Sequence, residues 1–187
     1  MTQCNLVVIG SSTGGLKVLE ELFTSLPVLN AAVIIIQHIT SLIDQSFVTS
    51  LARVSKMPVS LAREGASILP GHVYLAPGGR HLTLIRNSVI HQHDGEKVNS
   101  VRPSIDVAML SLSAPHGTKM VGVILTGMGS DGAAGISHVK QCGGITIAQD
   151  QQTSVIYGMP KAAVETGLVE HVLPTLRIAD KLSALFT

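Results

Sequence analysis

The 187-residue sequence contains no tryptophan, and aromatic residues make up only 3% of it. Charged residues are also scarce, at 13%, and the formal net charge is only +1. A chain this close to neutral lacks the basic surface that nucleic-acid binding and attraction to an anionic membrane require. We therefore expect no nucleic-acid partner.

Long hydrophobic runs are missing as well. No uninterrupted apolar stretch approaches the roughly 20 residues of a membrane-spanning helix, so we expect no direct membrane insertion. The N-terminus lacks the basic segment, apolar core and small-residue cleavage site of a signal peptide. The only two cysteines, Cys4 and Cys142, lie far apart. We expect them to be free thiols, which fits a reducing cytoplasm.

Aliphatic residues and glycine are abundant instead: 45% of the chain is hydrophobic, and it has 18 glycines. This profile is typical of a parallel sheet that helices bury on both faces. Aliphatic runs alternate with helix-like segments, which predicts an α/β, doubly wound, mostly parallel sheet. The predicted strands of this sheet are residues 5–10, 31–38, 120–127, 144–150 and 168–174.

The middle of the chain has a different pattern. Residues 72–97 alternate in polarity around Pro-Gly-Gly and Arg-Asn turns, which predicts an inserted antiparallel hairpin or meander. A short helix is expected after Pro103. Because the sequence has no repeat, low-complexity tract or long linker, we expect residues 1–187 to form a single domain.

Polar residues follow three of the predicted strands of the parallel sheet. Ser11, Ser12 and Thr13 follow the first, Gln37-His38 ends the second, and Asp131 lies in the glycine-rich turn after residues 120–127. In an open parallel sheet, functional groups gather at the carboxyl ends of the strands. These three turns are therefore the candidate functional site.

Each turn also has an ordinary explanation. The serines could cap a helix or belong to a phosphate-binding turn. Ser12 replaces the second glycine of the dinucleotide-binding motif, however, and Gln37-His38 stands where a nucleotide-binding oxidoreductase needs an acidic ribose contact. His38 alone is more often a structural residue, and Asp131 alone could be an N-cap.

Together, the three turns favour a serine hydrolase. Residues 10–14 match the G-x-S-x-G elbow, which presents its central serine, here Ser12, above the sheet. A serine hydroxyl needs a base to become a nucleophile, and His38 ends the adjacent predicted strand. The imidazole in turn needs a carboxylate to fix its tautomer, and Asp131 can supply it.

The chain closely resembles the catalytic domain of the CheB family of chemotaxis receptor protein-glutamate methylesterases. The matching segments cover about residues 6–174 and include VVIGSSTGG, IIIQH, LPGHVYLAPGGRHLTL, RPSIDV, VGVILTGMGSDGAAG, GGITIAQDQQTSVIYGMPKAA and GLVEHVLP. The resemblance implies Ser12 as nucleophile, His38 as base and Asp131 as its orienting acid. It also implies that the backbone N–H of Met128 helps to form an oxyanion hole and that Thr13 supports the active-site hydrogen bonding.

The implied reaction is hydrolysis of glutamate γ-methyl esters on the cytoplasmic helices of methylated chemoreceptors, which releases methanol. Deamidation of receptor glutamines uses the same groups, and neither reaction needs a cofactor or a metal. The alternative is a catalytically silent module of the same fold that binds chemoreceptors. A metal site at His91, His93 and Asp94 is a weaker hypothesis, because a solvated hairpin face explains these residues as well.

The sequence departs from the family pattern in two places. Thr40 and Ser41 follow the Gln-His pair where the family usually has a proline. The best-known family architecture has a phosphorylatable receiver domain before the catalytic domain, whereas Met1 lies only a few residues before the first strand here. We expect either a stand-alone catalytic domain or one that has been trimmed, with control by a separate receiver-domain regulator.

Overall fold

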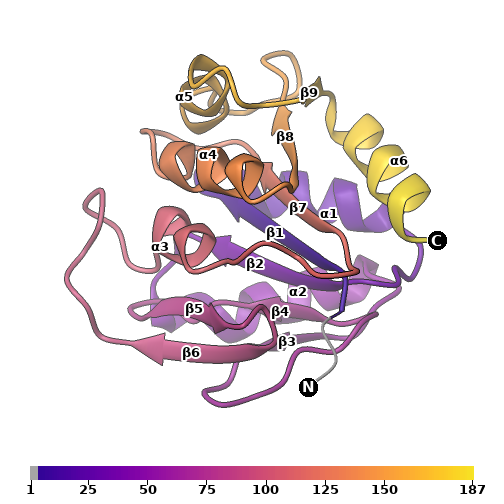
Figure 1. Cartoon of the computed structure of the whole chain (residues 1–187). Helices are drawn as coiled ribbons and strands as arrows, with labels where there is room; N and C mark the ends of the chain where they lie inside the picture. Colours follow the sequence, from indigo (N-terminus) through magenta and orange to yellow (C-terminus); the bar gives the residue numbers. More distant parts are fainter. Residues whose placement is uncertain (1–3) are drawn as a thin grey trace.

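The computed structural model describes residues 4–187, which form a three-layer α/β fold (Figure 1). The central layer is a parallel sheet with the strand order β3-β4-β2-β1-β7-β8-β9. Its strands are β1 (Leu6–Ser11), β2 (Ala32–Gln37), β3 (Val59–Leu61), β4 (Val73–Leu75), β7 (Met120–Ile124), β8 (Ile145–Gln149) and β9 (His171–Leu173).

Helices cover both faces of the sheet. One face carries α1 (Gly15–Ser25), α2 (Asp44–Val54) and α6 (Thr175–Phe186), and a short 3-10 helix, η1 (Ser41–Ile43), precedes α2. The other face carries α3 (Ile105–Leu110), α4 (Ala133–Gln141), α5 (Met159–Glu165) and the antiparallel hairpin of β5 (His81–Ile85) and β6 (Val89–His93).

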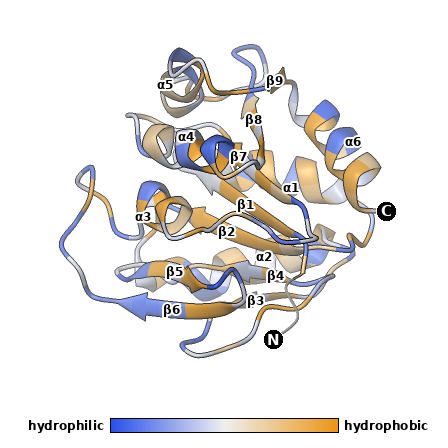
Figure 2. Cartoon of the chain, viewed as in Figure 1, coloured by the Kyte–Doolittle hydropathy of each residue, from blue (hydrophilic) through white to orange (hydrophobic). Residues whose placement is uncertain are grey.

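The two hydrophobic cores follow from the alternation of side chains along the buried strands. In β1, Val7 and Ile9 point to the α1 face, whereas Leu6 and Val8 point to the α3 face. Both sets are fully buried, so the strand reads as a continuous apolar run. Figure 2 shows β1 and β2 as hydrophobic between helices whose outer surfaces are more polar.

The expected fold class is confirmed, with one error of detail. Residues 73–75 were expected in the antiparallel insertion, but β4 pairs in parallel with β2 and β3 in the main sheet. Only β5 and β6 form the hairpin. A three-residue strand is too short for its periodicity to separate the two cases, and the equally short edge strand β3 was not predicted for the same reason.

The strand order places the three polar turns together. Strands β2, β4 and β3 lie on one side of β1 in the sheet, and the later strands β7, β8 and β9 lie on the other side. The carboxyl ends of β1, β2 and β7 therefore meet at the point where the strand order reverses, which is where open α/β sheets bind their ligands.

Candidate active site

Ser12 lies in a tight turn between β1 and α1. The N-cap of α1 is Gly14, with φ of 80°, and no side chain caps this helix, so neither serine is an N-cap. The backbone N–H of Ser12 donates to Thr126 O over 2.9 Å, and Thr126 Oγ1 donates to Thr13 O over 2.9 Å. Buried Thr126, just after β7, thus holds the turn from the neighbouring strand.

The two adjacent serines have different surroundings. Ser11 is fully buried, and its hydroxyl donates to Gln37 Oε1 over 2.6 Å. Gln37 Nε2 in turn donates to Ser12 O over 2.9 Å. Ser12 is partly exposed, and its hydroxyl makes no hydrogen bond with any other residue in 4–187. Ser11 therefore supports the turn, and Ser12 has the hydroxyl that is available to react.

Gly127 packs directly against the side chain of Ser12. A Cβ atom at Gly127 would lie 2.8 Å from Ser12 Cβ and 2.4 Å from Met159 Sδ. The backbone of Gly127 is also fixed, because its N–H donates to Ile156 O over 3.0 Å and its carbonyl accepts from Met159 N over 2.8 Å. The absence of a side chain at this position therefore allows Ser12 its place.

We expect Gly127→Ala to lower kcat for any reaction that uses Ser12 about 100-fold, because the new methyl group displaces the Ser12 side chain. Overpacking should also cost about 1–3 kcal/mol of unfolding free energy. The matched control is Gly122→Ala in β7, five residues earlier, whose Cβ would lie 2.8 Å from Ile136 Cδ1 rather than near Ser12. Steady-state kinetics and thermal unfolding of both variants check this. An equal loss of kcat in both would contradict it.

His38 follows β2 next to the end of β1, because the two strands are paired in register up to Ser11 and Gln37. Ser11 and Gln37 are partners in the parallel pairing of β1 and β2, and His38 N donates to Ser11 O over 3.2 Å. The imidazole Nε2 lies 2.8 Å from Asp131 Oδ2. The exposed fractions of the two side chains are 11% and 3%, so the pair is largely shielded from water.

Asp131 accepts five hydrogen bonds. Besides His38, the donors are Asn99 Nδ2 (2.9 Å), Ser104 Oγ (2.8 Å), Ile105 N (2.7 Å) and Asp106 N (3.3 Å). Burial by itself would raise the pKa of this carboxyl, but the hydrogen bonds outweigh burial and lower its pKa to about 2. Asp131 is therefore an ionised acceptor at neutral pH.

The charge of Asp131 determines the tautomer of His38. A carboxylate can only accept, so the Nε2 atom that faces it must carry the proton in the neutral imidazole. The lone pair is then on Nδ1, which is the nitrogen free to take a proton from a nucleophile. This is the arrangement that general-base catalysis requires.

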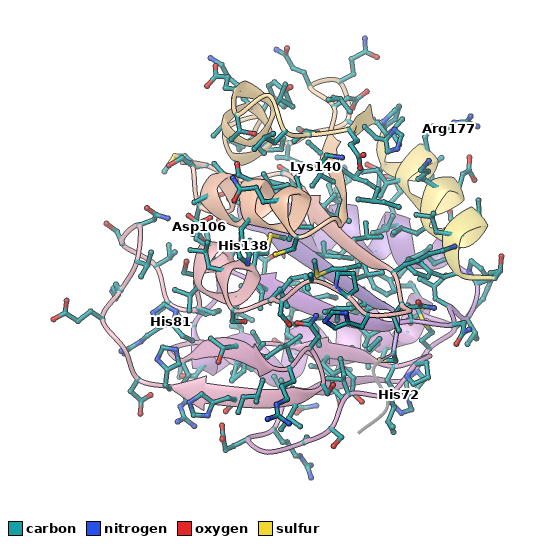
Figure 3. The ribbon with its side chains drawn as sticks, viewed as in Figure 1. His72, His81, Asp106, His138, Lys140 and Arg177 are labelled. Atoms are coloured by element: carbon teal, nitrogen blue, oxygen red, sulfur yellow. The ribbon has the colours of Figure 1, made fainter. Side chains whose placement is uncertain are left out.

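Asp131 does not cap the helix that follows it. Its carboxylate lies at the N-terminus of α3, whereas Asp106 of α3 accepts from Gly132 N (3.0 Å) and Gly135 N (2.7 Å) at the start of α4. Each helix thus supplies the carboxylate for the other, and Figure 3 shows Asp106 on the side of α3 that faces α4. Gly10 permits this packing, because a Cβ there would lie 2.6 Å from Ile105 Cγ2.

Thr13 follows Ser12 in the chain, and Met128 follows Gly127, which packs against Ser12. The Met128 side chain is 75% exposed, and that of Thr13 is exposed and makes no hydrogen bond with another described residue. Within residues 4–187, neither backbone N–H donates a hydrogen bond. Both N–H groups thus remain available. The place of the Met128 N–H in an oxyanion hole and the supporting role of Thr13 stay predictions.

The metal hypothesis gains no support from the geometry. His91 Nδ1 lies 3.0 Å from Glu64 Oε1, and Asp94 accepts from Arg80 Nε over 3.0 Å. Among the described residues, no group of three or more His, Cys, Asp or Glu side chains is placed to hold a metal ion. Cys4 and Cys142 are free thiols. Over residues 4–187, no helix has both the length and the apolar character to cross a bilayer.

The comparisons with known proteins agree with a hydrolase site at these strand ends. A sequence model described as CheB methylesterase matches residues 7–182. The chain belongs to the CheB methylesterase family. A solved structure, the Thermotoga maritima CheB methylesterase catalytic domain, is similar with a TM-score of 0.92 and 37% identity, covering 99% of this chain and 100% of the other.

Two curated relatives carry the name protein-glutamate methylesterase/protein-glutamine glutaminase. The Photorhabdus laumondii protein is 43% identical over 182 residues, or 96% of this chain. A second such protein, from Pseudomonas aeruginosa, is 43% identical over 180 residues, or 95% of this chain. In both cases the match covers 52% of the relative, so this chain spans about half the length of the relatives it matches.

Proposed function

We propose that this protein is a protein-glutamate methylesterase with Ser12 as nucleophile, His38 as general base and Asp131 as the residue that orients the base. The observation that carries the proposal is the 2.8 Å bond between His38 Nε2 and Asp131 Oδ2, at the edge of the sheet where Ser12 follows the paired Ser11. Residues 1–187 would then form one catalytic domain. The proposed substrates are glutamate γ-methyl esters on the cytoplasmic helices of chemoreceptors.

In the proposed acylation step, Ser12 Oγ attacks the ester carbonyl while His38 Nδ1 takes its proton. The negative charge that develops on the carbonyl oxygen is met by the backbone N–H groups of Met128 and Thr13. Each such donor is commonly worth about 3–4 kcal/mol in the transition state. Asp131 stabilises the imidazolium that forms, and His38 then donates the proton to methoxide, which leaves as methanol.

In the proposed deacylation step, His38 activates a water molecule that attacks the acyl-serine. The products are the free glutamate carboxylate and Ser12 with its proton restored. A receptor glutamine would enter the same cycle with ammonia as the leaving group, which is the basis for a second, deamidating activity. These steps are all proton and acyl transfers, and the three side chains supply the groups that they need.

The partners and location are part of the same proposal. The substrate helices belong to receptors whose signalling parts lie in the cytoplasm, so a cytoplasmic location follows from the substrate. The proposal also includes control of the activity by a separate receiver-domain protein. Such a regulator would act by covering or uncovering the turns around Ser12.

The experiment is methanol release from a panel of methylated chemoreceptors of the source organism, with Ser12→Ala as the control. We expect release from at least one receptor by the wild-type protein and only background from the variant. If wild-type and variant bind the receptors equally and neither releases methanol, the protein is the silent binding module instead.

A further inference from the structure

A tight turn at residues 98–101 places one asparagine over the buried carboxylates of the site. Val98 N donates to Val101 O over 3.2 Å, and Val101 N donates to Val98 O over 3.0 Å. The two central residues, Asn99 and Ser100, have φ of 51° and 66°. This left-handed backbone is one that asparagine tolerates better than most residues. In Figure 1 the segment belongs to the long loop that joins β6 to α3.

The amide of Asn99 joins the two acidic residues. Its Nδ2 lies 2.9 Å from Asp131 Oδ1 and 2.9 Å from Asp106 Oδ2. A side-chain amide nitrogen has two hydrogens, so Asn99 donates one to each carboxylate. Asn99 itself is exposed, whereas the two carboxylates are buried. The asparagine therefore covers the pair from the solvent side.

Asp106 and Asp131 are two buried carboxylates close to each other, and a hydrogen-bond donor between them stabilises both charges. Burial and the charge of Asp131 raise the pKa of Asp106, while the hydrogen bonds from Gly135, Asn99 and Gly132 oppose the rise. Of the groups that contact Asp131, His38 at the end of β2 and Asp106 of α3 are titratable. Asn99 and Ser104 contribute neutral donors.

We propose that Asn99 is a positioning residue for hydrolysis: its amide bridges Asp106 and Asp131 and keeps Asp131 aimed at His38 Nε2. This rests on the proposed function, because it assigns Asn99 a part in the action of that same site. Ser104 and Ile105 hold Asp131 from the start of α3. Asn99 holds the Oδ1 atom of the same carboxylate from the exposed loop, and its amide also binds Asp106.

The test uses Asn99→Gly, which deletes the amide and accepts the left-handed backbone without strain. The side-chain carboxyl carbons of aspartate are followed by ¹³C NMR as the pH is lowered. Without the bridging donor, we expect Asp131 and Asp106 each to titrate about one pH unit higher than in the wild-type protein. This measurement needs no substrate, so it stands even if the methylesterase proposal fails.

The kinetic arm measures methanol release by the same variant. We expect kcat to fall about 10-fold with KM unchanged, because Asp131 acts on the transition state through His38 rather than on substrate binding. A second variant, Asn99→Asp, keeps the size but replaces the donor by a third carboxylate. It should shift both titrations further and lower kcat by more than Asn99→Gly does.

The matched control is Asn87→Gly. Asn87 is buried and has φ of 54°. Its side-chain Nδ2 donates to Ser113 O over 2.7 Å and its Oδ1 accepts from Ser113 N, so among the described residues its amide bonds to no carboxylate. We expect it to lower the melting temperature and to leave both titrations in place. If Asn99→Gly titrates like the wild-type protein, or loses kcat only as much as Asn87→Gly, Asn99 has no positioning role.

Discussion

Ser12→Ala should reduce methanol release about a million-fold, to the residual rate that binding and the oxyanion donors provide without a nucleophile. The reason lies in the site, because Ser12 directly follows the Ser11–Gln37 pair at the ends of β1 and β2, where His38 also lies, and its hydroxyl is the proposed attacking group. The protein should still fold, since that hydroxyl makes no hydrogen bond with any residue in 4–187. Coupled methanol detection and thermal unfolding measure the two effects.

Ser11→Ala is the matched control, one residue away. Its hydroxyl is buried and bonded to Gln37 Oε1 at 2.6 Å, so its removal should cost about 1 kcal/mol of unfolding free energy. Because Gln37 also holds Ser12 O, a loss of about 10-fold in activity is expected from the loosened turn. Full activity in Ser12→Ala, or complete inactivity confined to Ser11→Ala, would contradict the assignment.

Asp131→Asn is the second large effect, and we expect a loss of about 10⁴-fold in kcat. Every group around Asp131 donates to it, so the amide nitrogen of the new asparagine must face a donor in either orientation. If it faces His38, the imidazole must hold its proton on Nδ1 and can no longer accept one from Ser12. If it points away, the imidazolium still loses its counter-charge. Steady-state kinetics measure the loss.

Asp106→Asn separates the role of Asp131 from the general effect of removing a charge. It takes one negative charge from the same cluster, but Asp106 makes no hydrogen bond to His38 within the described residues. The asparagine carbonyl can still accept from Gly132 and Gly135. We expect a loss within about 10-fold for this variant, and an equal loss in both would show that Asp131 has no special relation to the base.

Much of the site could be predicted from the sequence, because it follows from strand ends. Ser12, His38 and Asp131 each come directly after or near the end of an aliphatic strand, and parallel strands bring these ends to one edge of a sheet. The G-x-S-x-G spacing also distinguished Ser12 from Ser11. What the spacing could not give is the function of Ser11, which depends on a contact with Gln37 across the two strands.

The parts that escaped prediction depend on packing rather than on local pattern. Asn99, Ser104 and Asp106 lie in a loop and a short helix, and only the tertiary structure brings them to Asp131. Asp131 was predicted as the partner of His38, but its hydrogen bonds from the N-terminus of α3 were not predicted. The segment R-P-S-I-D (residues 102–106) could have predicted the start of α3, because serine is a favoured N-cap residue and an aspartate follows in the first turn.

In the fold, too, long strands could be predicted from the sequence and short ones could not. The long buried strands β1, β2 and β7 were predicted because runs of aliphatic residues and glycine without polar interruptions indicate a strand covered on both faces. The strand β4 was misplaced because its three residues carry too little pattern, and its partners were β2 and β3 rather than the hairpin. Short strands take their direction from the neighbours they pair with, which the sequence alone does not specify.

The most direct test of the account is to treat the protein with a fluorophosphonate, which phosphonylates an activated serine and expels fluoride, and to locate the adduct by peptide mass spectrometry. We predict one adduct per chain, on Ser12, with methanol release falling in proportion to labelling. Labelling should be far slower in Asp131→Asn. An adduct on Ser11, or full methanol release after complete labelling of Ser12, would contradict the claim that Ser12 is the nucleophile.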